Sequence, residues 1–273
     1  MKINRLRFHL TTQLLCLAVL VVSYRAAAED TNQWKIQVAG LRVVVPPANT
    51  NENARGAFFA SPGVTVVATL TSSSGKIVSI NQFESKLNSF ADDKGTDLLA
   101  MKSEDPFNKP GFGTMDAKES YATVEMQVAS LPAKGATSLN IAGKVSMLIA
   151  SSSKQFTVES VEMKTNASFS LGDLPVMISA MGTNHNSWQA KDYPYSIIFS
   201  SLRNLECISS LEFFDPQGSK IAAHKSSWGG GFMGYMMEYD IKQTVVRAKI
   251  VATCWQDLKT VEVPISIKTG IGL

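Results

Sequence analysis

Apolar and polar residues alternate along most of this chain with a period of two. Successive side chains of a β-strand point to opposite faces of a sheet, so the alternation predicts strands that bury one face. The stretches with the clearest alternation have these apolar members: Trp34, Ile36 and Val38; Leu41, Val43 and Val45; Val64, Val66, Ala68 and Leu70; Ala122, Val124, Met126 and Val128; Leu139, Ile141, Val145, Met147 and Ile149; Val246, Ala248, Ile250, Ala252 and Cys254; Val261, Val263, Ile265 and Ile267. We therefore expect an all-β, antiparallel fold.

One stretch fits either a strand or a helix. Ile77, Ile80, Phe83, Leu87 and Phe90 are three or four residues apart, which is also the spacing of an apolar helix face. The local sequence leaves both structures open.

The two halves of the chain resemble each other. Residues 87–90 followed by Asp92–Gly95 resemble residues 211–214 followed by Asp215–Gly218, and both segments are typical of a strand, a turn and a second strand. Further along, two more segments, Lys144–Val145 and Thr157–Glu159, resemble Lys249–Ile250 and Thr260–Glu262. This resemblance predicts an internal duplication. Because residues 205–213 alternate with period two, it also favours a strand for the stretch around Phe83.

The duplication places a domain boundary near residues 164–167. We expect two tandem antiparallel β-sandwich domains, residues 29–163 and residues 164–273, that are immunoglobulin-like in the broad sense. The cysteine, tryptophan, cysteine pattern of true immunoglobulin domains is missing, because Trp228 lies beside glycines and no tyrosine stands two residues before Cys254.

The first 28 residues have the pattern of a secretory signal peptide. They begin with basic residues, continue with an unbroken apolar run over Leu14–Val22, and end with small residues at Ala26–Ala28. The run is shorter than the roughly 20 residues that a spanning helix needs, so a retained anchor is the weaker interpretation. We expect residues 1–28 to be cleaved, the mature chain to begin at Glu29, and the protein to be secreted or periplasmic.

Cleavage would change the net charge. The whole chain has 26 basic and 23 acidic residues, a formal charge of +3, and four of the basic residues lie in the leader with no acidic one. The remaining 22 basic and 23 acidic residues give a charge of −1. A nucleic acid needs a concentrated positive field, so we expect no nucleic-acid partner. We also expect no integral membrane segment once the leader is removed.

Cysteines and histidines are few once the leader is removed. Cys16 lies within the leader, and Cys207 and Cys254 remain. An exported protein folds in an oxidising compartment, so we expect a Cys207–Cys254 disulfide, with two separate buried thiols as the alternative. His185 and His224 read as surface residues, and the chain has no nucleophile elbow, phosphate-binding loop or dinucleotide motif. We expect no cofactor, and an enzyme is the less favoured class.

An acidic cluster is the one weak metal candidate. Asp92, Asp93 and Asp97 could offer oxygen ligands to calcium. The same residues suit a hairpin turn, in which Asp favours the start and Gly95 the positive-φ position. The second half keeps the turn residues and loses the acidic cluster, so the turn is favoured and we expect no metal.

The most unusual local composition is the glycine-rich and aromatic segment 228–237. Trp228, Phe232 and Tyr235 would offer aromatic surface on a pliable backbone, as contact loops do. The alternative is a connection whose aromatic side chains cap the core.

These observations predict an exported, non-catalytic protein that binds a protein or glycan at a cell surface or in the periplasm. Two alternatives stay open. A carbohydrate-active hydrolase could assemble its two carboxylates only on folding, and an adhesive subunit could assemble through sheet edges.

Overall fold

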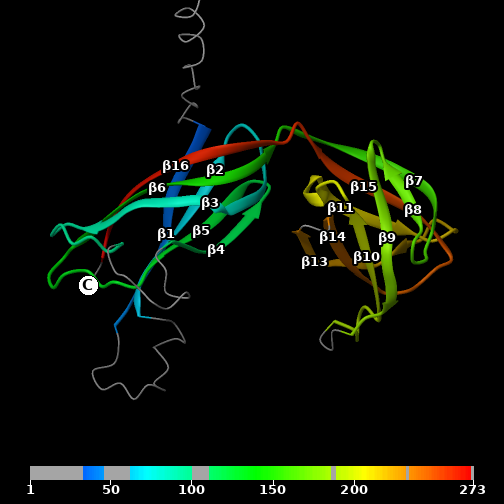
Figure 1. The fold of residues 1–273 in the computed structure, drawn as a ribbon, viewed down its shortest axis with the longest axis horizontal. Coiled ribbons are helices and arrows are strands. Elements are labelled where there is room, and N and C mark those ends of the chain that lie inside the picture. The colour runs from blue at the N-terminus through cyan, green and yellow to red at the C-terminus, as the bar shows by residue number, and fades with distance from the viewer. Residues whose placement is uncertain (1–32, 46–61, 100–110, 186–188, 232–233, 272–273) are drawn as a thin grey trace, which may run out of the picture.

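The computed structural model describes residues 33–45, 62–99, 111–185, 189–231 and 234–271, and these residues form an all-β protein (Figure 1). The strands are β1 (Trp34–Val44), β2 (Gly63–Ser72), β3 (Lys76–Asp92), β4 (Gly111–Lys118), β5 (Tyr121–Val128), β6 (Ser138–Ala150), β7 (Ser152–Glu162), β8 (Ser168–Leu171), β9 (Leu174–Thr183), β10 (Tyr195–Ser201), β11 (Ile208–Phe214), β12 (Lys220–Ile221), β13 (Ala223–Gly231), β14 (Gly234–Ile241), β15 (Arg247–Gln256) and β16 (Lys259–Gly270), with one 3₁₀ turn, η4 (Leu205–Cys207). Within these ranges no helix is long and apolar enough to cross a membrane. The predicted leader lies outside them.

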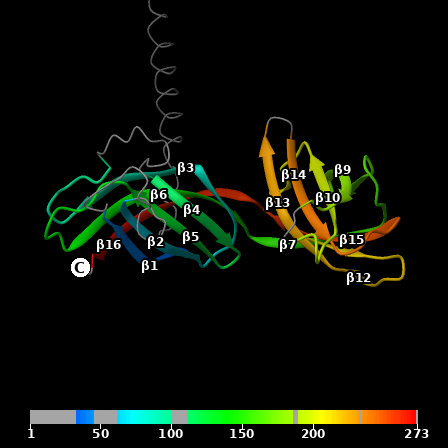
Figure 2. The ribbon, with the colours of Figure 1, turned by 90° about the horizontal axis from the view of Figure 1, so that it is seen from below.

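The strands pair in antiparallel sheets, which pack as two lobes (Figures 1 and 2). The sheets β1-β2-β5-β4 and β16-β6-β3 share one cluster of buried side chains, and we call them the first lobe. The sheets β13-β14-β10-β9-β8 and β12-β11-β15-β7 share another, and we call them the second lobe. The first lobe therefore takes in the described residues of 33–150 and 259–271, and the second lobe takes in those of 152–256.

The predicted alternating stretches contribute buried side chains to both cores. In β5, for example, Ala122, Val124 and Met126 are fully buried, and the residues between them are half-buried. The stretch that also fitted a helix is the strand β3, in which Leu87 and Phe90 are buried against β6. Each lobe thus closes because one face of every central strand is apolar.

The division of the chain between the lobes differs from the predicted boundary. Strand β16 pairs with β6 along its whole length, and its apolar face belongs to the first core. Strand β7 pairs with β15 and contributes Val161 to the second core. Alternation shows that a strand has a buried face, but it does not show which sheet the strand joins. The predicted ranges 29–163 and 164–273 therefore assign both strands to the opposite lobe.

Candidate functional site

An exposed aromatic side chain projects from the middle of strand β3. The pairing of β3 with β6 jumps from Asn81 to Lys86, so the residues between them bulge out of the ladder. Phe83 lies in this bulge and is 94% exposed, although its place in the apolar pattern suggests a core residue. A large apolar side chain held in water is costly, so this bulge is a candidate contact point.

Hydrogen bonds hold the bulge in shape. The Asn81 side-chain oxygen accepts the N–H groups of Phe83, at 3.1 Å, and Glu84, at 3.4 Å. The Ser85 hydroxyl donates to the Asn81 carbonyl at 2.7 Å and accepts from the Ser146 N–H at 3.1 Å. The Ser146 hydroxyl donates to Glu84 at 2.9 Å. The backbone that carries Phe83 is therefore held in place by hydrogen bonds, which we call the hydrogen-bonded base of Phe83.

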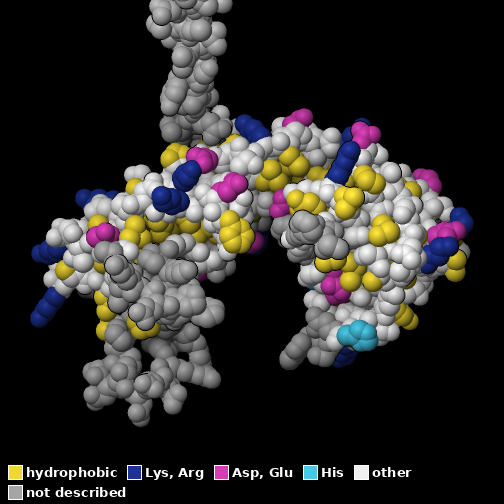
Figure 3. Space-filling view, viewed as in Figure 1, with side chains coloured by type: hydrophobic (Ala, Val, Ile, Leu, Met, Phe, Trp, Pro, Cys, Tyr) yellow, Lys and Arg dark blue, Asp and Glu magenta, His cyan; other side chains and the backbone are white. Residues whose placement is uncertain are grey.

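The bulge lies at the edge of a groove between the two lobes. One part of the groove is a cavity of about 730 Å³, and its lining includes Phe83 and Gln82 of the first lobe with Asn204 and Tyr235 of the second. A second cavity of about 490 Å³ continues it, since Ser79, Ile80 and Glu206 line both. The space-filling view shows the hollow between the lobes (Figure 3).

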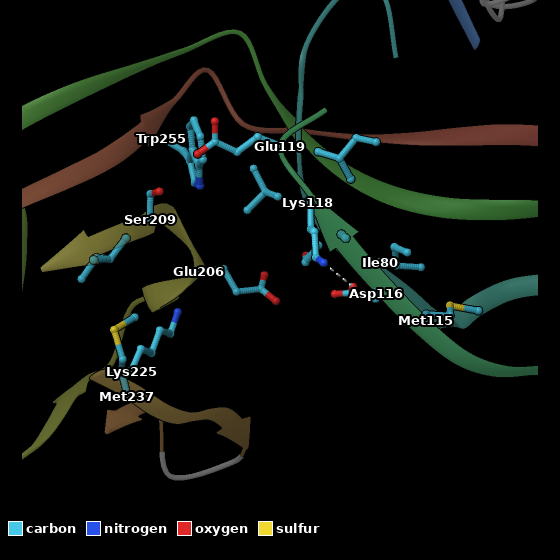
Figure 4. A pocket seen from close by; sticks show the side chains of 15 residues that line it. Ile80, Met115, Asp116, Lys118, Glu119, Glu206, Ser209, Lys225, Met237 and Trp255 are labelled. Atoms are coloured by element: carbon cyan, nitrogen blue, oxygen red, sulfur yellow. Dashed lines mark ion pairs between the residues drawn. The ribbon is translucent and has the colours of Figure 1, made fainter. Parts of the chain in front are cut away.

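Charged side chains stand on both walls of the second cavity. Figure 4 shows Asp116 and Lys118 of β4 on one wall and Glu206 and Lys225 on the other. Lys118 pairs with Asp116 at 3.7 Å, and Glu206 accepts from the Asn204 amide at 2.9 Å. Burial lowers the pKa of Lys225, and the negative charge of Glu206 opposes this effect. The walls can form hydrogen bonds and ion pairs with a ligand.

Of the three predicted contact residues, the structure describes the side chain of Tyr235 alone. Tyr235 is half-buried, packs against the second core and lines the groove. Its ring covers Gly230, because a Cβ at that glycine would come within 2.6 Å of the ring. The side chain of Trp228 and the whole of Phe232 lie outside the described atoms, so their contact role stays a prediction. Phe83 was missed because no local pattern marks a bulge within a long strand.

The predicted disulfide is absent, and this corrects the sequence analysis. Cys207 and Cys254 are free thiols, half-buried and buried respectively, although both line one small cavity. Burial raises the pKa of the Cys207 thiol, whose sulfur donates to the Asn204 carbonyl at 3.4 Å. Burial and the neighbouring Cys207 raise the pKa of Cys254 to about 11. Two thiols with raised pKa values are poor nucleophiles.

The acidic cluster is a hydrogen-bonded turn. One Asp92 carboxylate oxygen accepts the N–H groups of Lys94 and Thr96, and the other accepts that of Ala133 at 2.7 Å. Asp93 accepts from the Thr137 N–H and hydroxyl. Asp97 accepts the N–H of Leu99. The carboxylates therefore bind protein donors.

His185 and His224 both lie outside the groove lining. His185 and His224 are exposed, and the His224 ring lies 6.1 Å from the ring of Tyr193. Within the described ranges, no three His, Cys, Asp or Glu side chains gather as a group that could hold a metal ion. The described lining of the groove thus offers contacts for binding a ligand.

Comparison of the chain with protein-family models, curated proteins and solved structures finds no match. The interpretation of the site therefore rests on its own geometry.

Proposed function

We propose that this chain is an exported binding protein that holds a segment of another polypeptide in the groove between its lobes. Export is inferred from the leader pattern of residues 1–28. We also propose that the two lobes are two β-sandwich domains, immunoglobulin-like in the broad sense, since each lobe has two antiparallel sheets around one core. The boundaries of these two domains are those of the two lobes, since each lobe is defined by its own buried core.

The observation that carries the proposal is the exposure of Phe83 on a hydrogen-bonded base. Aromatic side chains at interfaces contribute large contact area at low entropic cost, and they dominate binding energy when they become buried. The backbone at Phe83 needs little further ordering on binding, because hydrogen bonds that involve Asn81, Ser85 and Ser146 already hold it.

The strands beside the groove favour a polypeptide over a glycan. β4 and β13 both line it, and each is the edge strand of its sheet. An edge strand presents backbone N–H and C=O groups that an extended polypeptide can pair with. Charged groups such as Lys118 and Lys225 then select among sequences.

The proposal is tested with the mature chain and two serine variants. Phe83→Ser removes the anchor, and Val246→Ser removes an apolar side chain that is 86% exposed and lies outside the groove lining. Each protein is immobilised and offered the extracytoplasmic proteins of producing cells, and a parallel array offers glycans. We expect Phe83→Ser to lower polypeptide binding at least tenfold, since such anchors contribute about 2 kcal/mol or more. Equal binding by both variants, or binding to glycans alone, would contradict the proposal.

Assembly of the chain with itself is the second candidate function, because those same edge strands are open to pairing with another copy. Sedimentation at high concentration separates the two. A species well above monomer mass supports self-assembly, and a monomer removes it.

A further inference from the structure

The two lobes have the same strand order. In the first lobe the sheets run β1-β2-β5-β4 and β16-β6-β3. In the second lobe the sheets contain β9-β10-β14-β13 and β11-β15-β7, with β8 and β12 added at edges. If β1, β2, β3, β4, β5 and β6 are matched in chain order to β9, β10, β11, β13, β14 and β15, every neighbour agrees, and every pairing in both lobes is antiparallel.

The turns after β3 and β11 are alike atom by atom. Asp92 and Asp215 each accept, on the same carboxylate oxygen, the N–H groups two and four residues later. Gly95 and Gly218 each donate to the carbonyl of that aspartate and have φ of +85° and +84°. Aligning the two turns matches Phe90 with Phe213. The resemblance in the sequence, residues 87–90 with residues 211–214, matches Phe90 with Phe214 instead, one residue further along.

A β-bulge recurs at the same place in the first sheet of each lobe. In β1 the extra residue follows Val38, where the partners step from Ala68 to Val67 on β2. In β9 it follows Ile178, where the partners step from Phe199 to Ile198 on β10. Bulges are retained as defined features of a fold, so a shared bulge supports a common origin.

The seventh strand of each lobe comes from the other half of the chain. By chain order β7 follows β6 and β16 follows β15, yet β7 pairs with β15 and β16 pairs with β6. We infer that the two lobes are copies of one seven-stranded unit that have exchanged their last strands. This inference does not depend on the proposed function.

The length of the connection between β6 and β7 explains why β7 leaves its own copy. One residue, Ser151, separates β6 from β7, whereas a hairpin needs a loop of at least two. β7 therefore cannot fold back onto β6 and continues into the other lobe, as short hinges favour in domain swapping. The two crossings run side by side: the Ser151 N–H donates to the Gln256 carbonyl at 3.3 Å, and its hydroxyl donates to Asp257 at 2.8 Å.

The exchange also accounts for the groove. Its walls include β3 and β4 from the first copy and their matched strands β11 and β13 from the second. The groove therefore lies between matched strands of the two copies.

Hydrogen exchange of the full mature chain tests the inference through a matched pair of core variants. Phe90→Leu loosens the first lobe and Phe213→Leu loosens the second, and both rings are fully buried at equivalent positions. We expect Phe90→Leu to accelerate amide exchange in β16 at least tenfold and to leave β7 unchanged. Phe213→Leu should do the reverse. Acceleration of β7 by Phe90→Leu and of β16 by Phe213→Leu would overturn the exchange.

If both variants accelerate amide exchange in every strand, engineered disulfides test the strand pairing directly. Ala142→Cys with Ser266→Cys joins β6 to β16, and Thr157→Cys with Val251→Cys joins β7 to β15, each at partnered positions. Peptide mapping should find both bonds after oxidation. Failure of both pairs to form would overturn the inference.

Discussion

The backbone N–H of Leu211 donates to the phenol oxygen of Tyr239 at 3.1 Å within the second core. Leu211 and Tyr239 lie on different sheets of the second lobe, so this bond ties β11 to β14. Burial raises the pKa of Tyr239 to about 12, and its ring packs edge-on against Phe199 and Phe213.

Tyr239→Phe should destabilise the protein by about 1–3 kcal/mol, because the Leu211 N–H stays buried without its partner. Urea unfolding measures the change. Tyr235→Phe is the matched control, since Tyr235 is half-buried and its ring remains, and it should shift stability by less than about 0.5 kcal/mol. Equal effects of the two variants would show that the Leu211 bond contributes nothing.

Gly95→Ala and Gly218→Ala should each cost about 1–2 kcal/mol, because both glycines have positive φ and an alanine strains the left-handed backbone. A Cβ at either position meets no atom within 4 Å, so the cost comes from the backbone alone. Gly182→Ala, also in open space but in strand β9, should be neutral or stabilising. Thermal unfolding gives all three values. A clear difference between the two turn variants would contradict the equivalence of the turns.

Acid should unfold the protein partly through Asp92. Burial raises the pKa of this carboxyl, but the N–H groups of Ala133, Thr96 and Lys94 outweigh burial and hold it below its usual value. A depressed folded pKa gives stability that is complete above the unfolded pKa, about 3.9, and is lost as pH falls through the folded value. Asp92→Asn should lower the melting temperature at neutral pH and should flatten its fall below about pH 4. Parallel acid limbs for the two proteins would show that Asp92 has no such role.

Both thiols should react slowly with iodoacetamide in the folded protein. With a pKa of about 11, roughly one Cys254 side chain in a thousand is ionised at about pH 8, and the thiolate is the reactive form. The half-buried Cys207 should react before Cys254, and both should react fully in urea. Intact mass measured without reductant decides the redox state. Two adducts fit free thiols, whereas no adduct and a mass lower by two hydrogens would show a disulfide.

The alternation in the sequence predicts the strands because it reflects burial of one face. Val124 and Ile250 are buried as their stretches require. The turn at Asp92–Gly95 is partly local, since the Asp92 side-chain oxygen accepts N–H groups two and four residues later, whereas its other oxygen accepts the N–H of the distant Ala133.

The partner of a strand is not a local property. Val261 of β16 and Val161 of β7 are both buried, but neither strand's own sequence shows which lobe receives it, and for β7 the one-residue link at Ser151 directs it to the second lobe. Phe83 shows the same limit, because its exposure depends on a register jump between Asn81 and Lys86 that involves a strand about sixty positions away. The free cysteines show a similar limit, because an oxidising compartment permits a disulfide but does not by itself pair two cysteines.

Photo-crosslinking from position 83 tests the binding role of the groove most directly. The chain from Glu29 onward carries p-benzoylphenylalanine in place of Phe83 or, as the control, in place of the exposed Val246. Both proteins are irradiated with the extracytoplasmic proteins of producing cells. We predict crosslinks to discrete polypeptides from position 83 that are absent from position 246. The same products from both positions, or no polypeptide product from position 83, would contradict the account.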